Sequence, residues 1–187
     1  MDFINIEDKT CYYNFYKSFS KHFNELYDYS SDVIIICIGT DRSTGDSLGP
    51  IIGYKLKPLL SSKINLYGTL SEPVHAKNIN KILNIIYKEY KHPFIIAIDA
   101  CLGSLKHVGH ISIGKGGIKP GAGVSKDLPV VGNMFVTGIV NISGFMEFML
   151  LQNTRLNTVM KMADIITNGM CKALDNIKFS FKERAFD

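Results

Sequence analysis

The sequence predicts a three-layer α/β/α sandwich, in which a mostly parallel sheet carries helices on both faces. Two observations lead to this prediction. Short runs of β-branched residues without alternation, such as residues 33–38 and 93–98, are typical of strands buried on both faces. Amphipathic segments alternate with these runs and no change of composition divides the chain, so residues 1–187 are expected to form one domain.

Helices are expected where apolar side chains recur at gaps of three and four, which places them on one face. The predicted helices are residues 10–29, 47–60, 76–90 and 145–176. The first occupies an N-terminal segment, residues 1–30, and its aromatic stripe would face the core. Pro50 is compatible with the second helix because it would lie in the first turn. After the last helix, residues 177–187 are expected to form a frayed tail.

Strands are expected at the apolar runs between these helices. The predicted strands are residues 33–38, 64–70, 93–98, 108–113 and 134–140. The Gly- and Pro-rich segment 114–129 predicts a loop, and we interpret residues 114–126 as a mobile cover over a substrate. This segment lacks the glycine spacing of a phosphate-binding loop, so a nucleotide site is not favoured.

Composition narrows the classes of protein that the chain can belong to. With 46% hydrophobic and 20% charged residues it can bury a core, and its apolar runs are too short to span a bilayer. The N-terminus has neither a basic nor an apolar signal region, and the four cysteines form no CxxC, so we expect a cytoplasmic protein without disulfides or structural zinc. The net charge of +4 without a basic cluster predicts no nucleic-acid partner.

Polar residues follow three of the predicted strands, and parallel strands bring such positions to one edge of the sheet. They are Asp41 and Asp46, then Glu72 and His75, then Asp99 and Cys101. Two neighbouring carboxyl groups can share a proton and act as base and acid, or they can hold a metal ion. Asp46 can also be read as the N-cap of the following helix, and the pattern alone leaves these alternatives open.

The histidines and Cys101 are weaker candidates. His75 would lie at the same sheet edge. His107 and His110 flank the start of a strand, and their spacing would place both on one face of a helix but not of a strand, so joint metal binding by this pair is not favoured. Cys101 could be a nucleophile with a histidine base, although a small buried residue is the simpler interpretation.

Several motifs in a fixed order carry a resemblance to a known family. They are GTDRSTGDSLGP (residues 39–50), PVHA (73–76), IDACLG (98–103), PGAGV (120–124) and LQNTRL (151–156). Together they resemble the YyaC family of sporulation proteins, over residues 33–163. That family in turn resembles the germination proteases of spore-forming bacteria, which cleave small acid-soluble spore proteins.

The resemblance implies an atypical aspartic endopeptidase on a phosphorylase/hydrolase-like fold. The catalytic aspartates of the germination proteases correspond to Asp46 and Asp99. No cofactor is implied, and the partner would be a protein or peptide substrate in the cytoplasm of a sporulating cell or spore. The residues expected to bind substrate are His75, Asp41, Gly121 and Gly123.

Two rival functions remain at this point. Hydrogenase-maturation endopeptidases share the fold more distantly, and an analogous divalent-metal site would consist of Asp46, Asp99 and His75. Those enzymes use a histidine late in the chain, whereas no histidine follows His110 here. The second rival is a catalytically inactive module that keeps the fold for peptide binding.

Overall fold

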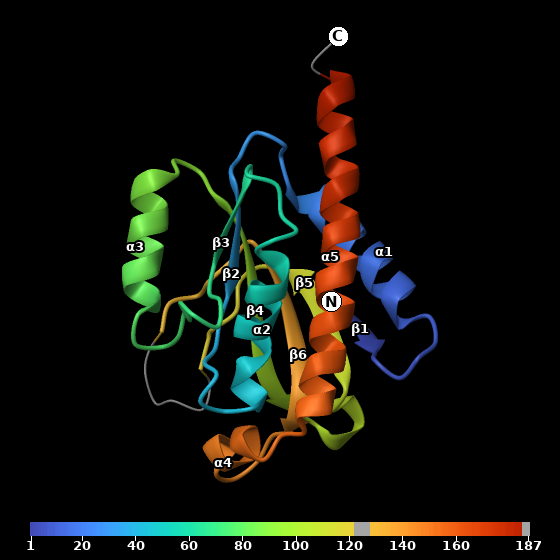
Figure 1. Cartoon of the computed structure of the whole chain (residues 1–187), viewed down its shortest axis with the longest axis vertical. Coiled ribbons are helices and arrows are strands. Elements are labelled where there is room, and N and C mark those ends of the chain that lie inside the picture. Colours follow the sequence, from blue (N-terminus) through green and yellow to red (C-terminus); the bar gives the residue numbers. More distant parts are fainter. Residues whose placement is uncertain (122–127, 185–187) are drawn as a thin grey trace.

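A computed structural model describes residues 1–121 and 128–184, with side chains described as far as residue 175. Its centre is a six-stranded sheet with the order β1-β5-β6-β4-β2-β3 (Figure 1). The strands are β1 (Asp2–Asn5), β2 (Val33–Cys37), β3 (Ile64–Tyr67), β4 (Phe94–Gly103), β5 (His110–Lys115) and β6 (Met134–Ile142). β3, β2, β4 and β6 run parallel, whereas β5 and β1 are antiparallel to their neighbours. The predicted mostly parallel sheet is therefore confirmed.

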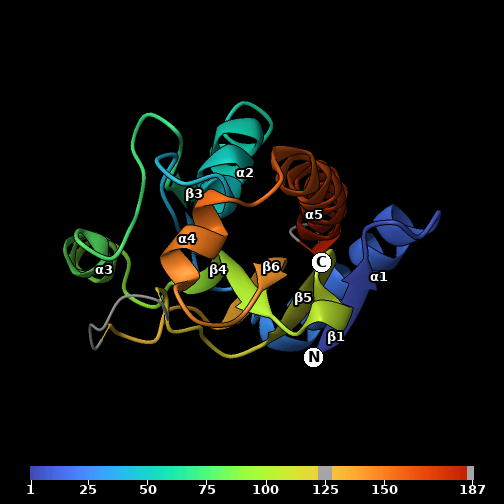
Figure 2. The same cartoon turned by 90° about the horizontal axis from the view of Figure 1, so that it is seen from below.

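Helices cover both faces of this sheet, as predicted. On one face, α1 (Cys11–Leu26), α2 (Leu48–Leu56) and α5 (Leu156–Arg184) pack into a large apolar cluster. On the other face, α3 (Ile79–Glu89) packs over a smaller cluster (Figure 2). The short helix α4 (Glu147–Gln152) lies at the end of the sheet where the parallel strands finish. Two single turns of 3-10 helix, Gly45–Ser47 and Leu105–His107, complete the described elements.

Burial explains why these segments adopt their structures. All five residues of β2 are buried, because the helices of both layers cover this central strand. In α1, the aromatic stripe of Phe15, Phe19 and Phe23 is fully buried against the sheet and α5. No helix in the described part of the chain is long and apolar enough to cross a membrane.

Several predicted boundaries are wrong, and for the strands pairing with residues distant in sequence decides the outcome. β4 does not end near Asp99 but continues to Gly103, because its last residues pair with β6. β5 extends to Lys115, so the first two residues of the predicted loop 114–129 are strand. β1 was not predicted at all, and α5 continues to Arg184 through most of the expected frayed tail.

The predicted helix at 145–176 is also wrong, because it is divided into α4 and α5. At the break, the Thr154 hydroxyl donates to the backbone oxygen of Leu150, at 2.9 Å. The Asn141 side-chain amide, from β6, donates to the same oxygen at 2.9 Å. These bonds occupy a carbonyl group that a continuing helix would use, so the chain leaves the helical path here.

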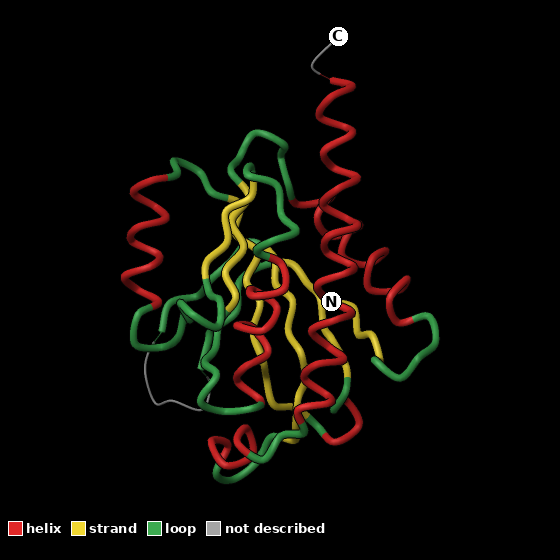
Figure 3. The backbone as a smooth tube through the Cα atoms, viewed as in Figure 1, coloured by secondary structure: helices red, strands yellow, loops and turns green. Residues whose placement is uncertain are grey.

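The topology contains a switch point between β2 and β4. From β2 the chain passes through α2 to β3 on one side, and then through α3 to β4 on the other side. The loops that follow these strands gather at one end of the sheet (Figure 3). A crevice outside the carboxyl ends of strands at such a point is the usual ligand site of an open α/β sheet.

Candidate active site

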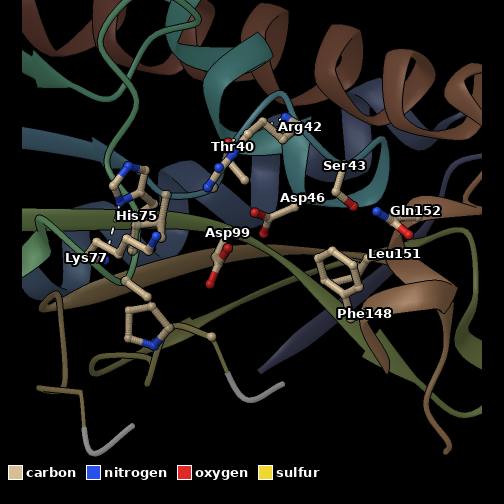
Figure 4. A pocket seen from close by; sticks show the side chains of 15 residues that line it. Thr40, Arg42, Ser43, Asp46, His75, Lys77, Asp99, Phe148, Leu151 and Gln152 are labelled. Atoms are coloured by element: carbon tan, nitrogen blue, oxygen red, sulfur yellow. Dashed lines mark hydrogen bonds between the residues drawn. The ribbon is translucent and has the colours of Figure 1, made fainter. Parts of the chain in front are cut away.

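A pocket of about 520 Å³ opens at this switch point (Figure 4). Its walls come from the loop after β2, the loop after β3, β4, residues 120–121 and α4. The residues that line it include Thr40, Arg42, Ser43, Asp46, His75, Lys77, Asp99, Phe148, Leu151 and Gln152. The pocket therefore combines two carboxyl groups with an apolar wall.

Asp99 is the more deeply buried of the two carboxyl groups of this pocket, with only 7% of its surface exposed. It lies within β4, opposite Thr137 of β6, one residue beyond the last pairing of β4 with β2. Its Oδ1 accepts a hydrogen bond from the Ala100 backbone N–H at 2.8 Å. Burial raises the pKa of Asp99 well above its ordinary value, and the nearby Asp46 carboxylate raises it further.

Asp46 approaches from the other side of the switch point. It lies in the 3-10 turn before α2, and the N-cap residue of α2 is Ser47, so Asp46 is not the N-cap that the sequence also allowed. Burial raises the pKa of the half-buried Asp46 carboxyl, while the Thr40 backbone N–H and His75 act in the opposite direction. Gly39, with φ of +139°, permits this turn, because a Cβ there would collide with the Asp46 backbone oxygen.

The carboxyl groups of Asp46 and Asp99 point toward one another across the pocket (Figure 4). Both have raised pKa values, and the charge of Asp46 contributes to the shift at Asp99. Such a pair can hold one proton between two groups, so that one group acts as a base and the other as an acid.

The structure places His75 in the wall of the same pocket. Its Nδ1 accepts the Lys77 backbone N–H at 3.3 Å, and its backbone N–H donates to Asn78 Oδ1 at 2.8 Å. A neutral His75 therefore carries its proton on Nε2. The ring is held in place by its own loop, and in its protonated form its charge lowers the pKa of Asp46.

The other sequence candidates lie in different places. Gly121 lines the pocket in a left-handed conformation, with φ of +67°, and Gly123 lies outside the described residues together with 122–126 of the predicted cover. Asp41 is exposed and lines a second hollow of about 460 Å³ between α2 and α5. Burial raises the pKa of the Cys101 thiol to about 11, so little reactive thiolate exists near neutral pH.

Among residues 1–121 and 128–175, no three His, Cys, Asp or Glu side chains gather closely enough to hold an ion. Asp46, Asp99 and His75 do not form such a group of three, and the divalent-metal alternative at these residues stays a prediction.

Sequence reasoning missed the contribution of α4, which supplies Phe148, Leu151 and Gln152 to the pocket. The LQNTRL motif marked this region, but no periodicity linked it to the carboxyl groups. The link is a close contact: a Cβ on Gly45, beside Asp46, would lie 2.8 Å from Thr154 Oγ1 and 2.9 Å from Leu151 Cδ2. The absence of a side chain at Gly45 thus lets α4 pack against the turn that carries Asp46.

The α/β fold that carries this carboxyl pair is similar to the fold of a solved protease. A [NiFe] hydrogenase maturation protease, HycI from Thermococcus kodakarensis KOD1, superposes with a TM-score of 0.55 at 14% sequence identity. The superposition covers 84% of this chain and 99% of HycI. At this level of identity the similarity establishes the fold, and the predicted fold class is confirmed.

The family is established by sequence. The chain belongs to the family described as "Protein of unknown function (DUF1256)", whose model matches residues 3–169. It is also 58% identical over 138 residues to the "Uncharacterized protein YyaC" of Bacillus subtilis (strain 168). That match covers 74% of this chain and 67% of the Bacillus protein, so the resemblance to the YyaC family is confirmed.

Proposed function

We propose that this chain is an endopeptidase in which Asp46 and Asp99 together hydrolyse a peptide bond. One observation carries the proposal: two carboxyl groups with raised pKa values face each other in a pocket at the switch point. The peptidase-like fold supports the same function.

The two aspartates have different environments and therefore take different roles, Asp99 as the acid and Asp46 as the base. Asp99 is more deeply buried, so it holds the shared proton, and its O–H hydrogen-bonds to the substrate carbonyl oxygen and polarises the carbonyl group. Asp46, ionised, takes a proton from a water molecule as the water oxygen bonds to the carbonyl carbon. Asp99 then gives its proton to the amide nitrogen, the C–N bond breaks, and the pair again holds one proton, now on Asp46.

The substrate that we propose is a protein of the sporulating cell. The basis is the resemblance of residues 44–50, 98–101 and 120–124 to germination proteases, which act on small acid-soluble spore proteins. This also makes the cytoplasm of a sporulating cell or spore the proposed site of action.

The direct test is digestion of purified small acid-soluble spore proteins and of a casein-derived peptide pool, with products identified by mass spectrometry. The wild-type chain is expected to cleave, and Asp46→Asn and Asp99→Asn are each expected to lose about 10²–10⁴-fold in rate. Circular dichroism of each variant is the control for folding. No cleavage by a folded wild-type chain would favour the inactive peptide-binding module. Loss of activity on chelation, with rescue by a divalent ion, would contradict the metal-independent mechanism.

A further inference from the structure

The surface beside the pocket is unusually apolar. In the segment that leads into α4, Phe145 is 94% exposed and Met146 is 57% exposed. Within α4, Phe148 is 65% exposed and Met149 is 47% exposed. Phe148 also lines the pocket with Leu151, so this exposed surface is continuous with the pocket wall. Contiguous exposed apolar side chains of this kind mark a binding surface.

Ser43 is a second, independent feature of the same wall. It lines the pocket and is only 6% exposed, yet its hydroxyl has no hydrogen-bond partner among the described residues. Figure 4 shows it on the side of the pocket toward Gln152. A buried hydroxyl without a partner destabilises a fold, so its presence calls for an explanation outside the folded chain itself.

The wall is also held in place before any ligand arrives. Asn141 Nδ2 donates to the Leu150 backbone oxygen and, at 3.3 Å, to Thr154 Oγ1. The close approach at Gly45 fixes the other side of α4. A preformed apolar wall binds a side chain without first having to be ordered.

We propose that the α4 side of the pocket is a subsite for one bulky apolar side chain of an extended peptide, and that the Ser43 hydroxyl bonds to the peptide main chain beside it. This rests on the proposed function, because the subsite lies next to the two carboxyl groups. Phe148 and Leu151 contact the apolar side chain. A hydroxyl both donates and accepts hydrogen bonds, which suits the peptide N–H and C=O groups that flank that side chain.

An extended peptide accounts for all of these features, whereas a second folded copy of the chain does not. A second copy could cover the exposed faces of Phe145 and Phe148. It would leave the pocket interior and the buried Ser43 hydroxyl unused, because these lie behind the surface.

The test measures binding separately from cleavage. The full chain carrying Asp99→Asn is titrated into fluorescein-labelled host peptides of Gly, Ser and Ala that differ only in a central Phe, Leu, Lys or Asp. Fluorescence polarisation is expected to give at least about tenfold tighter binding for Phe and Leu. Phe148→Ser is expected to remove this preference. Leu59→Ser is the matched control, since Leu59 is 55% exposed and follows α2 at the opposite end of the sheet, and it is expected to bind normally.

Ser43→Ala separates a ligand-binding hydroxyl from a structural one. All host peptides are expected to bind about two- to tenfold more weakly, while the melting temperature stays the same or rises. Unchanged binding with this variant would contradict the role of Ser43.

Equal affinity for all four peptides would overturn the subsite, even if the wild-type chain cleaves proteins. Apolar preference without any cleavage would support the subsite and overturn the proposed function. A change of oligomeric state in Phe148→Ser, measured by light scattering with peptide binding intact, would assign the surface to a second copy and overturn the subsite.

Discussion

The carboxyl group of Asp99 is buried more deeply than that of Asp46, although the two face each other in one pocket. Asp99 lies inside β4, where the residues around it pair with β2 and β6. Asp46 lies in a turn that still contacts solvent. Desolvation therefore acts more strongly on Asp99, and the charge of Asp46 acts in the same direction. This asymmetry determines which aspartate keeps a proton, and several expected outcomes depend on it.

The first prediction concerns the dependence of activity on pH. The proposed base, Asp46, must be ionised, and its raised pKa places the acidic limb above the usual aspartate value of about 3.9. The proposed acid, Asp99, must be protonated, so activity should fall again as the pH rises through its still higher pKa. We expect a bell-shaped profile of kcat/KM, measured with a fluorogenic peptide. A rate that rises continuously to pH 9 would contradict the role of Asp99.

The second prediction is that Asp99→Asn stabilises the fold at neutral pH. Because the folded-state pKa of Asp99 is raised above about 3.9, its contribution to stability is present at low pH and is lost as the pH rises through the folded pKa. Above the unfolded-state pKa, folding the wild type requires Asp99 either to take up a proton or to bury its charge, whereas asparagine requires neither and can still accept the Ala100 N–H. Thermal unfolding at pH 7.5 should show a higher Tm than the wild type, by about 2–4 °C for each 1 kcal/mol gained.

The pH dependence of that difference is the critical part of the measurement. Near pH 3.5 most of the Tm gain should disappear, because the wild-type carboxyl is then largely protonated in both states. Asp8→Asn, at an exposed position, serves as the control. A Tm difference of the same size at both pH values would show that packing, and not ionisation, is responsible.

The third prediction concerns His75, whose charge lowers the pKa of Asp46. His75→Gln removes this charge, so the acidic limb of the kcat/KM profile should move to higher pH. The maximal rate should change less than in Asp46→Asn, because glutamine leaves both carboxyl groups in place. An acidic limb at an unchanged position would mean that His75 does not act on Asp46.

The fourth prediction separates the carboxyl pair from the thiol. Since burial raises the pKa of Cys101 to about 11, Cys101→Ser should retain nearly full cleavage activity near neutral pH. Alkylation of Cys101 by iodoacetamide should likewise be slow in the folded chain. Complete loss of activity in a folded Cys101→Ser variant would favour a thiol mechanism over the one proposed.

The fifth prediction tests how α4 is held against the turn of Asp46. Gly45→Ala adds a methyl group 3.0 Å or less from Leu151 and Thr154, so it should destabilise the fold by about 1–3 kcal/mol and reduce activity. Gly144→Ala is the matched control, because its new Cβ would meet only Leu150 Cδ1, at 3.9 Å. Urea denaturation should leave this control within about 0.5 kcal/mol of the wild type.

The meeting of Asp46 and Asp99 at one edge could be predicted because it follows from local information. β2 is identified by its own composition, since a strand buried on both faces has no polar position. Once the sheet is parallel, residues that follow successive strands must lie at the same edge. Predicting that the two carboxyl groups meet therefore required only the order of the strands and the positions of the acidic residues.

The apolar wall could not be predicted in this way. Whether residues 145–176 form one helix or two depends on Asn141, which reaches Leu150 from a different element. The extension of β4 beyond Asp99 and the existence of β1 depend equally on partners far along the chain. A single side chain or strand pairing of this kind leaves no periodic signal in the sequence.

Because the chain is synthesised from its N-terminus, the late position of β6 in the sequence determines when the pocket can form. A ribosome that has made residues 1–133 has produced both aspartates, but neither the strand that lies beside Asp99 nor the helix that closes the pocket. Domains fold as units once their partners in the sheet are available. The peptidase that we propose is therefore expected to remain inert while it is a nascent chain. Its hydrolytic chemistry would begin only after translation has passed the last strand.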